Sequence, residues 1–332
     1  MEVPFQAKKN LIFGPNGAGK TSVLEAIFLL GFGKSFLSVS KEELIQDRAD
    51  GFSVLAQVQN RWNENRIGAS LSGKSFRLQL NDQPTNKSEI CNYLHPILFS
   101  SHTFQNSLDF RPRLRGLMDR FIFGVHSLYL HYILRYNKAL KQKNHLLKNR
   151  VRAIDISEIA SWNKILAEMG SKLIEERMKF VTQLNEAIAN RFGNDLRIEY
   201  RPSLPSPGPI SQDTIFLDLQ AAMPHELKSK RSLIGPQRDQ FDIWLKKRKL
   251  NTFSSGEKKK FFMMMYFSYI GFYKKERQEY PVFLIDDFDS ALDQENLDFL
   301  VDHYPDVQIV ATSVKRNKKF DHFIELRRRS NP

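Results

Sequence analysis

The segment GPNGAGKT at residues 14–21 constrains the fold of this chain more than any other feature of the sequence. It fits the pattern G-x-x-x-x-G-K-[ST], in which glycines let backbone N–H groups turn inward around phosphate groups. The apolar run at residues 10–13 predicts a buried strand before it, and the apolar residues between 21 and 30 follow helical spacing. Because this strand–loop–helix context is the one such a loop requires, the segment predicts a site for a nucleotide's phosphates.

Each residue type in this loop has a chemical reason to be there. We expect Lys20 to reach the β- and γ-phosphates and the Thr21 hydroxyl to ligate Mg²⁺, while the helix N-terminus adds its dipole. The predicted nucleotide-binding set of this segment is Gly14, Asn16, Gly17, Gly19, Lys20, Thr21 and Ser22.

A second acidic motif lies near the C-terminus. The apolar run at residues 282–285 predicts a buried strand, which ends in Asp286 and Asp287. Ligands of open α/β folds bind at the carboxyl edge of the sheet, where this strand would deliver both acids. We expect Asp286 to hold Mg²⁺ and Asp287 to orient or activate the attacking water. A run of this kind is weak evidence alone and strong evidence beside the phosphate loop.

The excess of positive charge is concentrated in two segments. The 332 residues carry 50 Lys and Arg against 37 Asp and Glu, a formal net charge of +13. Residues 111–152 hold eleven basic residues and one acid, and residues 226–260 hold eleven and four. Either segment alone is as well explained by a solvated helix or loop face. Together they suggest a basic surface for a polyanion such as nucleic acid or an anionic membrane face.

Hydrophobic spacing predicts how the rest of the chain is organised. Residues 51–90 alternate as a small antiparallel sheet does, with a hairpin turn at Asn81-Asp82. Helical patterns run from 114 to about 150 and from Ser157, the predicted N-cap, to 192, with Gly193 as the stop, and these two helices should pack antiparallel. The proline-rich stretch 201–210 predicts a loop.

These elements predict an α/β fold with an inserted helical lobe. We assign residues 1–105 to the N-terminal part of the α/β lobe, 106–210 to the inserted lobe, and 211–332 to the C-terminal part. The single cysteine, Cys91, excludes an internal disulfide and a Cys-based zinc site, and fits a reducing compartment. The apolar stretch 261–273 is too short to span a bilayer and predicts a buried helix, and the start of the chain lacks the layout of a signal peptide. A cytoplasmic protein without a membrane partner is expected.

The order of the motifs resembles that of ABC-type ATPases. Ser254-x-Gly256 precedes the predicted buried helix, and Ser290-Ala291-Leu292-Asp293 follows the acidic strand. With the GPNGAGKT loop, this layout resembles the SMC/Rad50/RecF group. Within that group the chain is similar to the RecF family of bacterial recombination mediators, through Lys34-Ser35, Glu43-Leu44-Ile45, the region 113–119 and the segment GPQRD at 235–239. The resemblance covers residues 10–313, and implies an ABC-type ATPase head with a mixed sheet, a small antiparallel sheet and a helical insertion.

The resemblance implies a homodimer that closes on ATP. Ser254 and Gly256 of one subunit would contact the γ-phosphate held by Lys20 and Thr21 of the other, so Ser254 joins Lys20 and Asp287 in the implied catalytic set. Asp293 would bridge the two sites. The closed dimer would clamp double-stranded or gapped DNA on the nucleoid and hydrolyse ATP slowly. RecF-like proteins act with RecO and RecR to help load RecA in DNA repair and replication restart.

Several positions depart from the family pattern. Only nine residues precede Asn10, so the strand and hairpin that usually come first are missing or shortened, which affects the sheet edge and the adenine pocket. His102 stands where a water-orienting Gln or Glu is usual, and is as well explained as a loop histidine. Gln237 replaces the family's histidine in the GPQRD segment. Thr312-Ser313 stand where transporter-type ATPases carry a switch histidine.

Other readings predict different properties. A transporter ATPase subunit is disfavoured because its signature lies much nearer the phosphate loop. A Rad50-like end-joining protein needs far longer heptad helices and a Cys-x-x-Cys hook, although an SMC/Rad50-like ATPase with another DNA-associated function stays open. A RecF-like DNA-binding protein with impaired hydrolysis also stays open.

Overall fold

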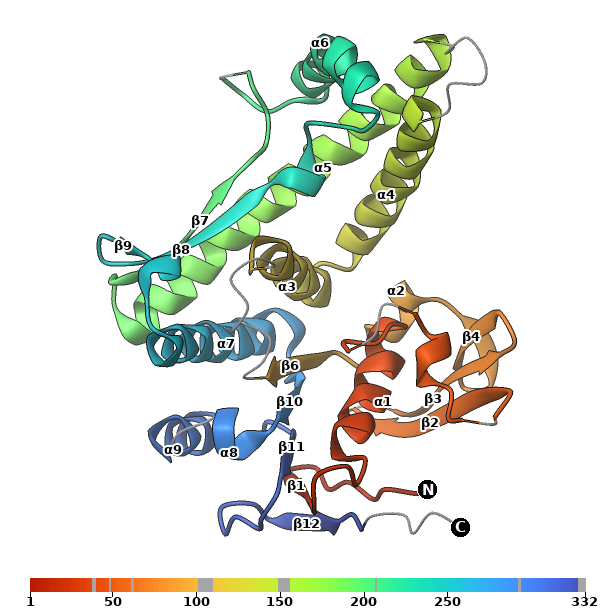
Figure 1. The fold of residues 1–332 in the computed structure, drawn as a ribbon. Coiled ribbons are helices and arrows are strands. Elements are labelled where there is room, and N and C mark those ends of the chain that lie inside the picture. Colours follow the sequence, from red (N-terminus) through yellow and green to blue (C-terminus); the bar gives the residue numbers. More distant parts are fainter. Residues whose placement is uncertain are drawn as a thin grey trace. The chain divides into compact units, whose positions relative to one another are not determined.

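The chain forms two compact units. The computed structural model describes residues 1–37, 40–47, 49–60, 63–100, 110–148, 156–206, 208–291 and 294–327. One unit consists of Met1–Ser107 with Ser255–Pro332, and the other of Leu108–Ser254 (Figure 1). Residues 211–254 therefore belong with the helical unit and not, as predicted, with the C-terminal part of the α/β lobe. Strand β8 (Gln240–Leu245) explains the difference, because it pairs with β7 (Leu196–Arg201).

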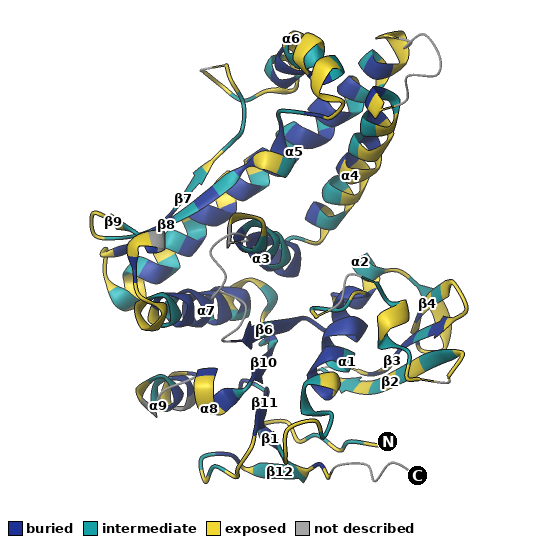
Figure 2. Cartoon of the chain, in the orientation of Figure 1, coloured by how far each residue is buried: buried dark blue, intermediate teal, exposed yellow. Residues whose placement is uncertain are grey.

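A five-stranded parallel sheet forms the centre of the first unit. Its strands lie in the order β12 (His322–Glu325), β1 (Lys9–Phe13), β11 (Ile309–Ser313), β10 (Val282–Asp286) and β6 (Pro96–Ser100). Every pairing in this sheet is parallel. Parallel strands are covered on both faces and so form continuous apolar runs, which is why β1 and β10 were predicted from the sequence (Figure 2). β12 is one edge strand of this sheet and pairs with β1.

Helix α1 (Lys20–Phe32) lies between the central sheet and the small antiparallel sheet. The small sheet has the order β2 (Gly51–Gln59), β3 (Glu64–Ser72), β4 (Ser75–Leu80) and β5 (Gln83–Thr85) and is followed by α2 (Lys87–Ile90). Their shared core is Leu29, Leu30, Ile67, Ala69, Leu78, Leu80, Ile90 and Leu94. The predicted hairpin is confirmed, because Asn81 and Asp82 both have positive φ, at 51° and 65°, as a type I′ turn requires.

Helix α7 (Ser255–Arg277) contacts the sheet on its other face. The Tyr266 ring stacks on Phe283 of β10, and its hydroxyl donates to the Leu98 carbonyl of β6 at 2.5 Å. Helices α8 (Phe288–Ala291) and α9 (Gln294–His303) follow β10, and Phe267 of α7 stacks on Phe299 of α9. The predicted buried helix is thus confirmed as a covering layer of the sheet.

The second unit is mainly helical. It contains α3 (Phe110–Val125), α4 (Ser127–Lys148), α5 (Ile156–Phe192) and α6 (Gln212–Ser229), with a sheet of β7, β8 and β9 (Arg248–Lys249). Helices α4 and α5 pack antiparallel as predicted (Figure 1). Two details differ: the first predicted helix is interrupted at His126, and Ser157 is not an N-cap because α5 already includes Ile156. Gly193, with φ of 77°, ends α5 as expected.

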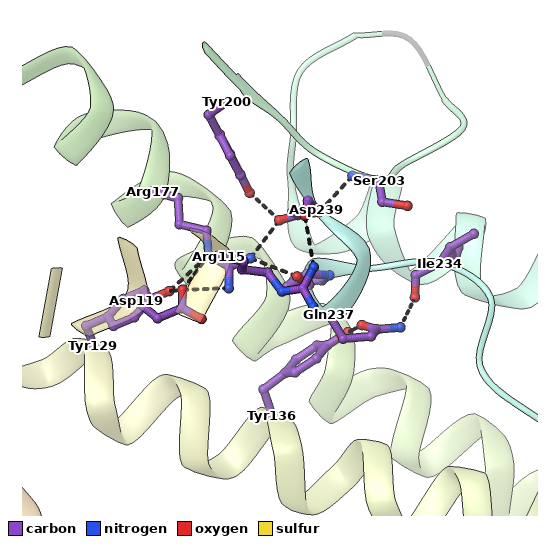
Figure 3. Close-up of polar contacts among 11 residues, drawn as sticks. Arg115, Asp119, Tyr129, Tyr136, Arg177, Tyr200, Ser203, Ile234, Gln237 and Asp239 are labelled. Atoms are coloured by element: carbon purple, nitrogen blue, oxygen red, sulfur yellow. Dashed lines mark hydrogen bonds and ion pairs between the residues drawn. The ribbon is translucent and has the colours of Figure 1, made fainter. Parts of the chain in front are cut away.

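A buried ion cluster around Arg177 holds the helical unit together (Figure 3). The Arg177 guanidinium on α5 donates to Asp119 of α3 and to Asp239, at 2.8 Å in each case. Burial disfavours a charged Arg177, but the adjacent carboxylates raise its pKa well above the usual value. Tyr129 and Tyr200 donate their hydroxyls to the same two carboxylates. Buried charges require such partners, so this cluster fixes α3, α5 and the GPQRD segment relative to one another.

The cluster gives two of the family-like motifs a structural role. Asp119 ends the region 113–119, and Asp239 ends the GPQRD segment, whose residues Pro236–Arg238 form a short 3₁₀ helix. Gln237 accepts a hydrogen bond from the Tyr136 hydroxyl and donates to the Ile234 carbonyl at 2.7 Å. These contacts stabilise the fold of the helical unit and include no contact with a phosphate loop.

Candidate phosphate-binding site

The loop after β1 requires glycine at two positions. Gly14 has φ of 151°, and a Cβ atom there would lie 2.1 Å from the Leu326 carbonyl oxygen. That close approach arises because the Leu326 N–H donates to the Phe13 carbonyl at 2.8 Å. Gly19 is the N-cap of α1 in the left-handed region, with φ of 89°. The glycines of the motif therefore set the path of the backbone from strand to helix.

The start of α1 presents positive charge to this loop. The Lys20 ammonium donates to the carbonyls of Gly14 and Pro15, at 2.8 and 3.0 Å. The first turn of α1 contains no acidic residue, so nothing there offsets the positive end of the helix dipole. Asn16 and Gly17 are exposed within the loop, and Ser22 is exposed in the first turn. An anion approaching this loop would meet backbone N–H groups and one ammonium.

The two predicted metal ligands meet beside the loop. The Thr21 hydroxyl donates to Oδ1 of Asp286 at 3.0 Å. Asp286 is the last residue of β10, its side chain is buried, and its Oδ1 also accepts from the Thr312 hydroxyl at 2.9 Å. A carboxylate and a hydroxyl are the hard oxygen ligands that Mg²⁺ prefers.

Asp287 follows in a backbone conformation that is unusual for a non-glycine residue. Its φ is 53°, and its N–H donates to the Thr312 hydroxyl oxygen at 2.8 Å. The Ser290 hydroxyl lies 2.7 Å from Oδ2 of Asp287 and donates to it. This left-handed residue turns the chain at the end of β10.

The structure describes two of the four remaining residues that the sequence singled out, Ser254 and Gly256. Ser254 ends the helical unit, and Gly256 lies in the first turn of α7 in the other unit; both are exposed. The Lys259 ammonium of α7 donates to the Ser290 carbonyl, which links this helix to the turn after Asp287. Asp293 and His102 lie outside the described residues.

Sequence reasoning missed contributions from three residues. Thr312 was noted only because it stands, with Ser313, where transporter-type ATPases carry a switch histidine, and its contacts depend on β11 lying between β1 and β10. Ser290 was recognised as part of the Ser290–Asp293 motif, but its hydrogen bond to Asp287 was not predicted. Arg177 lies in a helical pattern whose apolar seam gave no sign of a buried cation. No local pattern predicts the hydrogen-bond partners of Thr312 or the ion-pair partners of Arg177, because these partners are distant in the chain.

Comparison with known proteins identifies the family. The family described as the RecF/RecN/SMC N terminal domain matches residues 1–319. The DNA replication and repair protein RecF of Carboxydothermus hydrogenoformans is 32% identical over 303 residues, covering 90% of this chain and 85% of that protein. The chain belongs to the RecF family. The RecF protein of Clostridioides difficile is 26% identical and covers 97% of this chain and 90% of its own length.

Solved structures of this family confirm the fold class. A structure of the recombination mediator protein RecF with ATPrS, in the RecFOR pathway, aligns with a TM-score of 0.83 at 24% identity. It covers 96% of this chain and 90% of that chain. The predicted ABC-type ATPase head with a helical insertion is therefore confirmed. Among the helices of the described residues, none is both long and apolar enough to cross a membrane.

Proposed function

We propose that this RecF-family chain binds and slowly hydrolyses ATP at the loop of residues 14–21, and uses that cycle to control its hold on DNA. The observation that carries the proposal is the meeting of Thr21 and Asp286, 3.0 Å apart, beside Lys20 and the N-terminus of α1. Relatives described as DNA replication and repair proteins, and a solved RecF–ATP structure, support this choice of ligand.

Mg²⁺ fits the residues at this site. Thr21 and the buried Asp286 supply oxygen atoms only, and no cluster of three or more His, Cys, Asp or Glu side chains suited to a metal occurs among the residues that the structure describes. Such a site suits an ion that takes its other ligands from phosphate and water. When bound, Mg²⁺ would neutralise charge on the β- and γ-phosphates.

Hydrolysis requires a water in line with the γ-phosphate. The water oxygen bonds to the γ-phosphorus, the bond to the oxygen bridging to the β-phosphate breaks, and ADP and inorganic phosphate leave. Asp287 is the residue that we assign to orient this water and accept its proton. Its carboxylate has a hydroxyl donor on one oxygen, Ser290, which fixes its direction. Lys20 and the backbone N–H groups of the loop stabilise negative charge on the phosphates.

The signature residues would act on a second copy of the chain. Ser254 and Gly256 are exposed, as a contribution to another subunit's nucleotide requires. The Ser254 hydroxyl and the Gly256 N–H are suitable donors for γ-phosphate oxygens. Asp293 would bridge the two sites of this ATP-dependent homodimer. ATP would therefore close the dimer, and hydrolysis would open it.

DNA is the polyanion that we assign to the basic surface. The excess of positive charge in residues 111–152 and 226–260 suits a phosphate backbone and favours contacts without sequence preference. We propose that the dimer clamps double-stranded or gapped DNA on the nucleoid in the cytoplasm. We further propose that it acts with RecO and RecR to help load RecA.

The test measures the mass of the protein in solution. Light scattering with ATP, with ADP and without nucleotide, repeated with gapped DNA, should give a dimer only with ATP. ATP turnover should be slow and should rise when DNA is added. A mass that is the same with ATP, with ADP and without nucleotide would contradict the proposed dimer cycle. If the chain does not hydrolyse ATP but still binds DNA in an ATP-dependent way, the alternative of a RecF-like protein with impaired hydrolysis is favoured.

A further inference from the structure

We infer that Thr312 is a positioning residue for ATP hydrolysis, one that sets the two adjacent acids of the site at once. This inference rests on the proposed function and concerns the same site. The Thr312 hydroxyl donates to Oδ1 of Asp286 at 2.9 Å and accepts the N–H of Asp287 at 2.8 Å. The Thr312 hydroxyl thus acts as a donor to one acid and as an acceptor for the next. We have assigned these two acids different roles, Mg²⁺ binding to Asp286 and water activation to Asp287.

Strand register explains how Thr312 contacts both acids. β11 lies between the strand that leads to the phosphate loop and the strand that ends in the acids. Thr312 is level with Ile12 on one side, and Ala311 with Ile285 on the other, so Thr312 stands level with Asp286. This register places the Thr312 side chain beside Asp286, which Ser100 of β6 flanks on the opposite side.

The hydroxyl is buried, which makes its two bonds matter. Thr312 is 1% exposed and Asp286 is 8% exposed, so water has little access to replace either bond. Asp287 is held at φ of 53°, a conformation of higher energy, and the bond from its N–H to Thr312 is the tertiary contact that supports it. Without the hydroxyl, the Asp286 carboxylate would lose one of its two hydroxyl donors, and the Asp287 N–H would lose its acceptor.

The neighbouring residue extends the same arrangement. Oδ2 of Asp289, on α8, lies 2.6 Å from the Ser313 hydroxyl and accepts the Val314 N–H at 3.2 Å. The end of β11 therefore contacts both the acids and the first helix of the segment that leads to Asp293. The Thr312 hydroxyl therefore gives Asp286 and Asp287 one fixed hydrogen-bond partner each within the protein.

The test compares variants that differ in the hydroxyl. Thr312→Val keeps the shape and removes both bonds, and Thr312→Ser keeps the hydroxyl. Thr312→Ala differs from Thr312→Ser by one oxygen and serves if the valine variant fails to fold. The matched control is Thr182→Val, on an exposed position of α5. The measurements are kcat and KM for ATP hydrolysis, and the Kd for ATP with Mg²⁺ and with EDTA.

A hydrogen bond to a charged group stabilises by an amount worth about tenfold to a hundredfold in rate. We expect Thr312→Val and Thr312→Ala to lower kcat by about that factor, while the Kd for ATP in EDTA changes less than about twofold and KM follows the Kd measured with Mg²⁺. The gain in ATP affinity that Mg²⁺ provides should fall about tenfold, and Thr312→Ser should behave as the parent does.

Two results would overturn the inference: unchanged kcat and Mg²⁺ dependence in both hydroxyl-free variants, or a Thr312→Ser variant as impaired as Thr312→Ala. The second result would mean that the side-chain shape matters and the hydroxyl does not. If the parent chain itself fails to hydrolyse ATP, the proposed function is wrong in that respect, and the Mg²⁺-dependent gain in affinity still decides the role of Thr312.

Discussion

The Thr21 hydroxyl donates to Oδ1 of Asp286 at 3.0 Å, although 265 positions of the sequence separate the two residues. The contact forms because β1 and β10 both flank β11 in one parallel sheet, so their carboxyl ends open at the same edge. This single contact joins the loop predicted to hold phosphates to the strand predicted to hold Mg²⁺. The predictions that follow test each part of the arrangement.

Replacing Lys20 by alanine should abolish measurable ATP binding. The ammonium lies over the loop, 2.8 Å from the Gly14 carbonyl, where it can pair with the phosphates. Loss of a charge-assisted contact of this kind should raise the Kd by about a hundredfold. A fluorescent ATP titration measures the change. Lys8→Ala, an exposed lysine before β1, is the control and should bind as the parent does; parent-like affinity in Lys20→Ala would refute the loop assignment.

Replacing Ser254 by arginine should leave ATP binding intact and prevent the ATP-dependent dimer. Ser254 is exposed, so the larger side chain has room in a single chain but would obstruct a second copy. Light scattering with ATP measures the mass, and the ATP titration checks binding. Ser75→Arg, at the exposed start of β4, is the matched control. A normal dimer in Ser254→Arg would remove the signature role that we assign.

Replacing Asp287 by asparagine should reduce hydrolysis and prolong the nucleotide-bound dimer. General-base catalysis contributes about a hundredfold to ten-thousandfold, and the amide cannot accept the proton. Single-turnover hydrolysis measures the rate, and the Kd for ATP should change little. Asp302→Asn, an exposed acid on α9, should leave the rate unchanged. Undiminished turnover in Asp287→Asn would mean that another group activates the water.

Replacing Arg177 by methionine should destabilise the helical unit strongly. The substitution leaves the carboxylates of Asp119 and Asp239 in a buried position without their cation. Removing one partner of a buried ion pair costs about 3–5 kcal/mol. Urea unfolding, followed by circular dichroism, measures the loss. Arg66→Met breaks an exposed pair with Asp82 and should cost less than about 1 kcal/mol; equal losses in the two variants would contradict the structural role of the cluster.

Cys91 should react with a thiol reagent only after unfolding. Burial raises the pKa of this thiol to about 12, so the folded chain carries almost no thiolate at pH 8. The pKa of an exposed thiol is about 9.0, so the thiol loses its proton at a lower pH in the unfolded chain than in the folded chain. The contribution of Cys91 to folding stability is therefore complete below pH 9 and declines as the pH rises from about 9 to 12. Labelling rates with and without urea measure the difference; rapid labelling of the native chain at pH 8 would disprove it.

The sequence by itself determined the local elements of this protein. The glycine pattern of residues 14–21 fixed a strand–loop–helix unit, because only glycine fits the backbone at Gly14 and Gly19. Continuous apolar runs fixed the buried strands, and alternating residues with Asn81-Asp82 fixed the hairpin. Motif order also fixed the family. These features depend on neighbours within a few residues, which a linear pattern records.

Tertiary structure decided how distant residues meet. Thr312 acquires its two partners only because β11 pairs between β1 and β10, and Arg177 becomes a buried cation only because α3 and the GPQRD segment bring acids to α5. The pairing of β8 with β7 likewise moved residues 211–254 into the helical unit. Strand order and helix packing follow from the burial of whole surfaces, and no short stretch of sequence encodes which surfaces will adjoin.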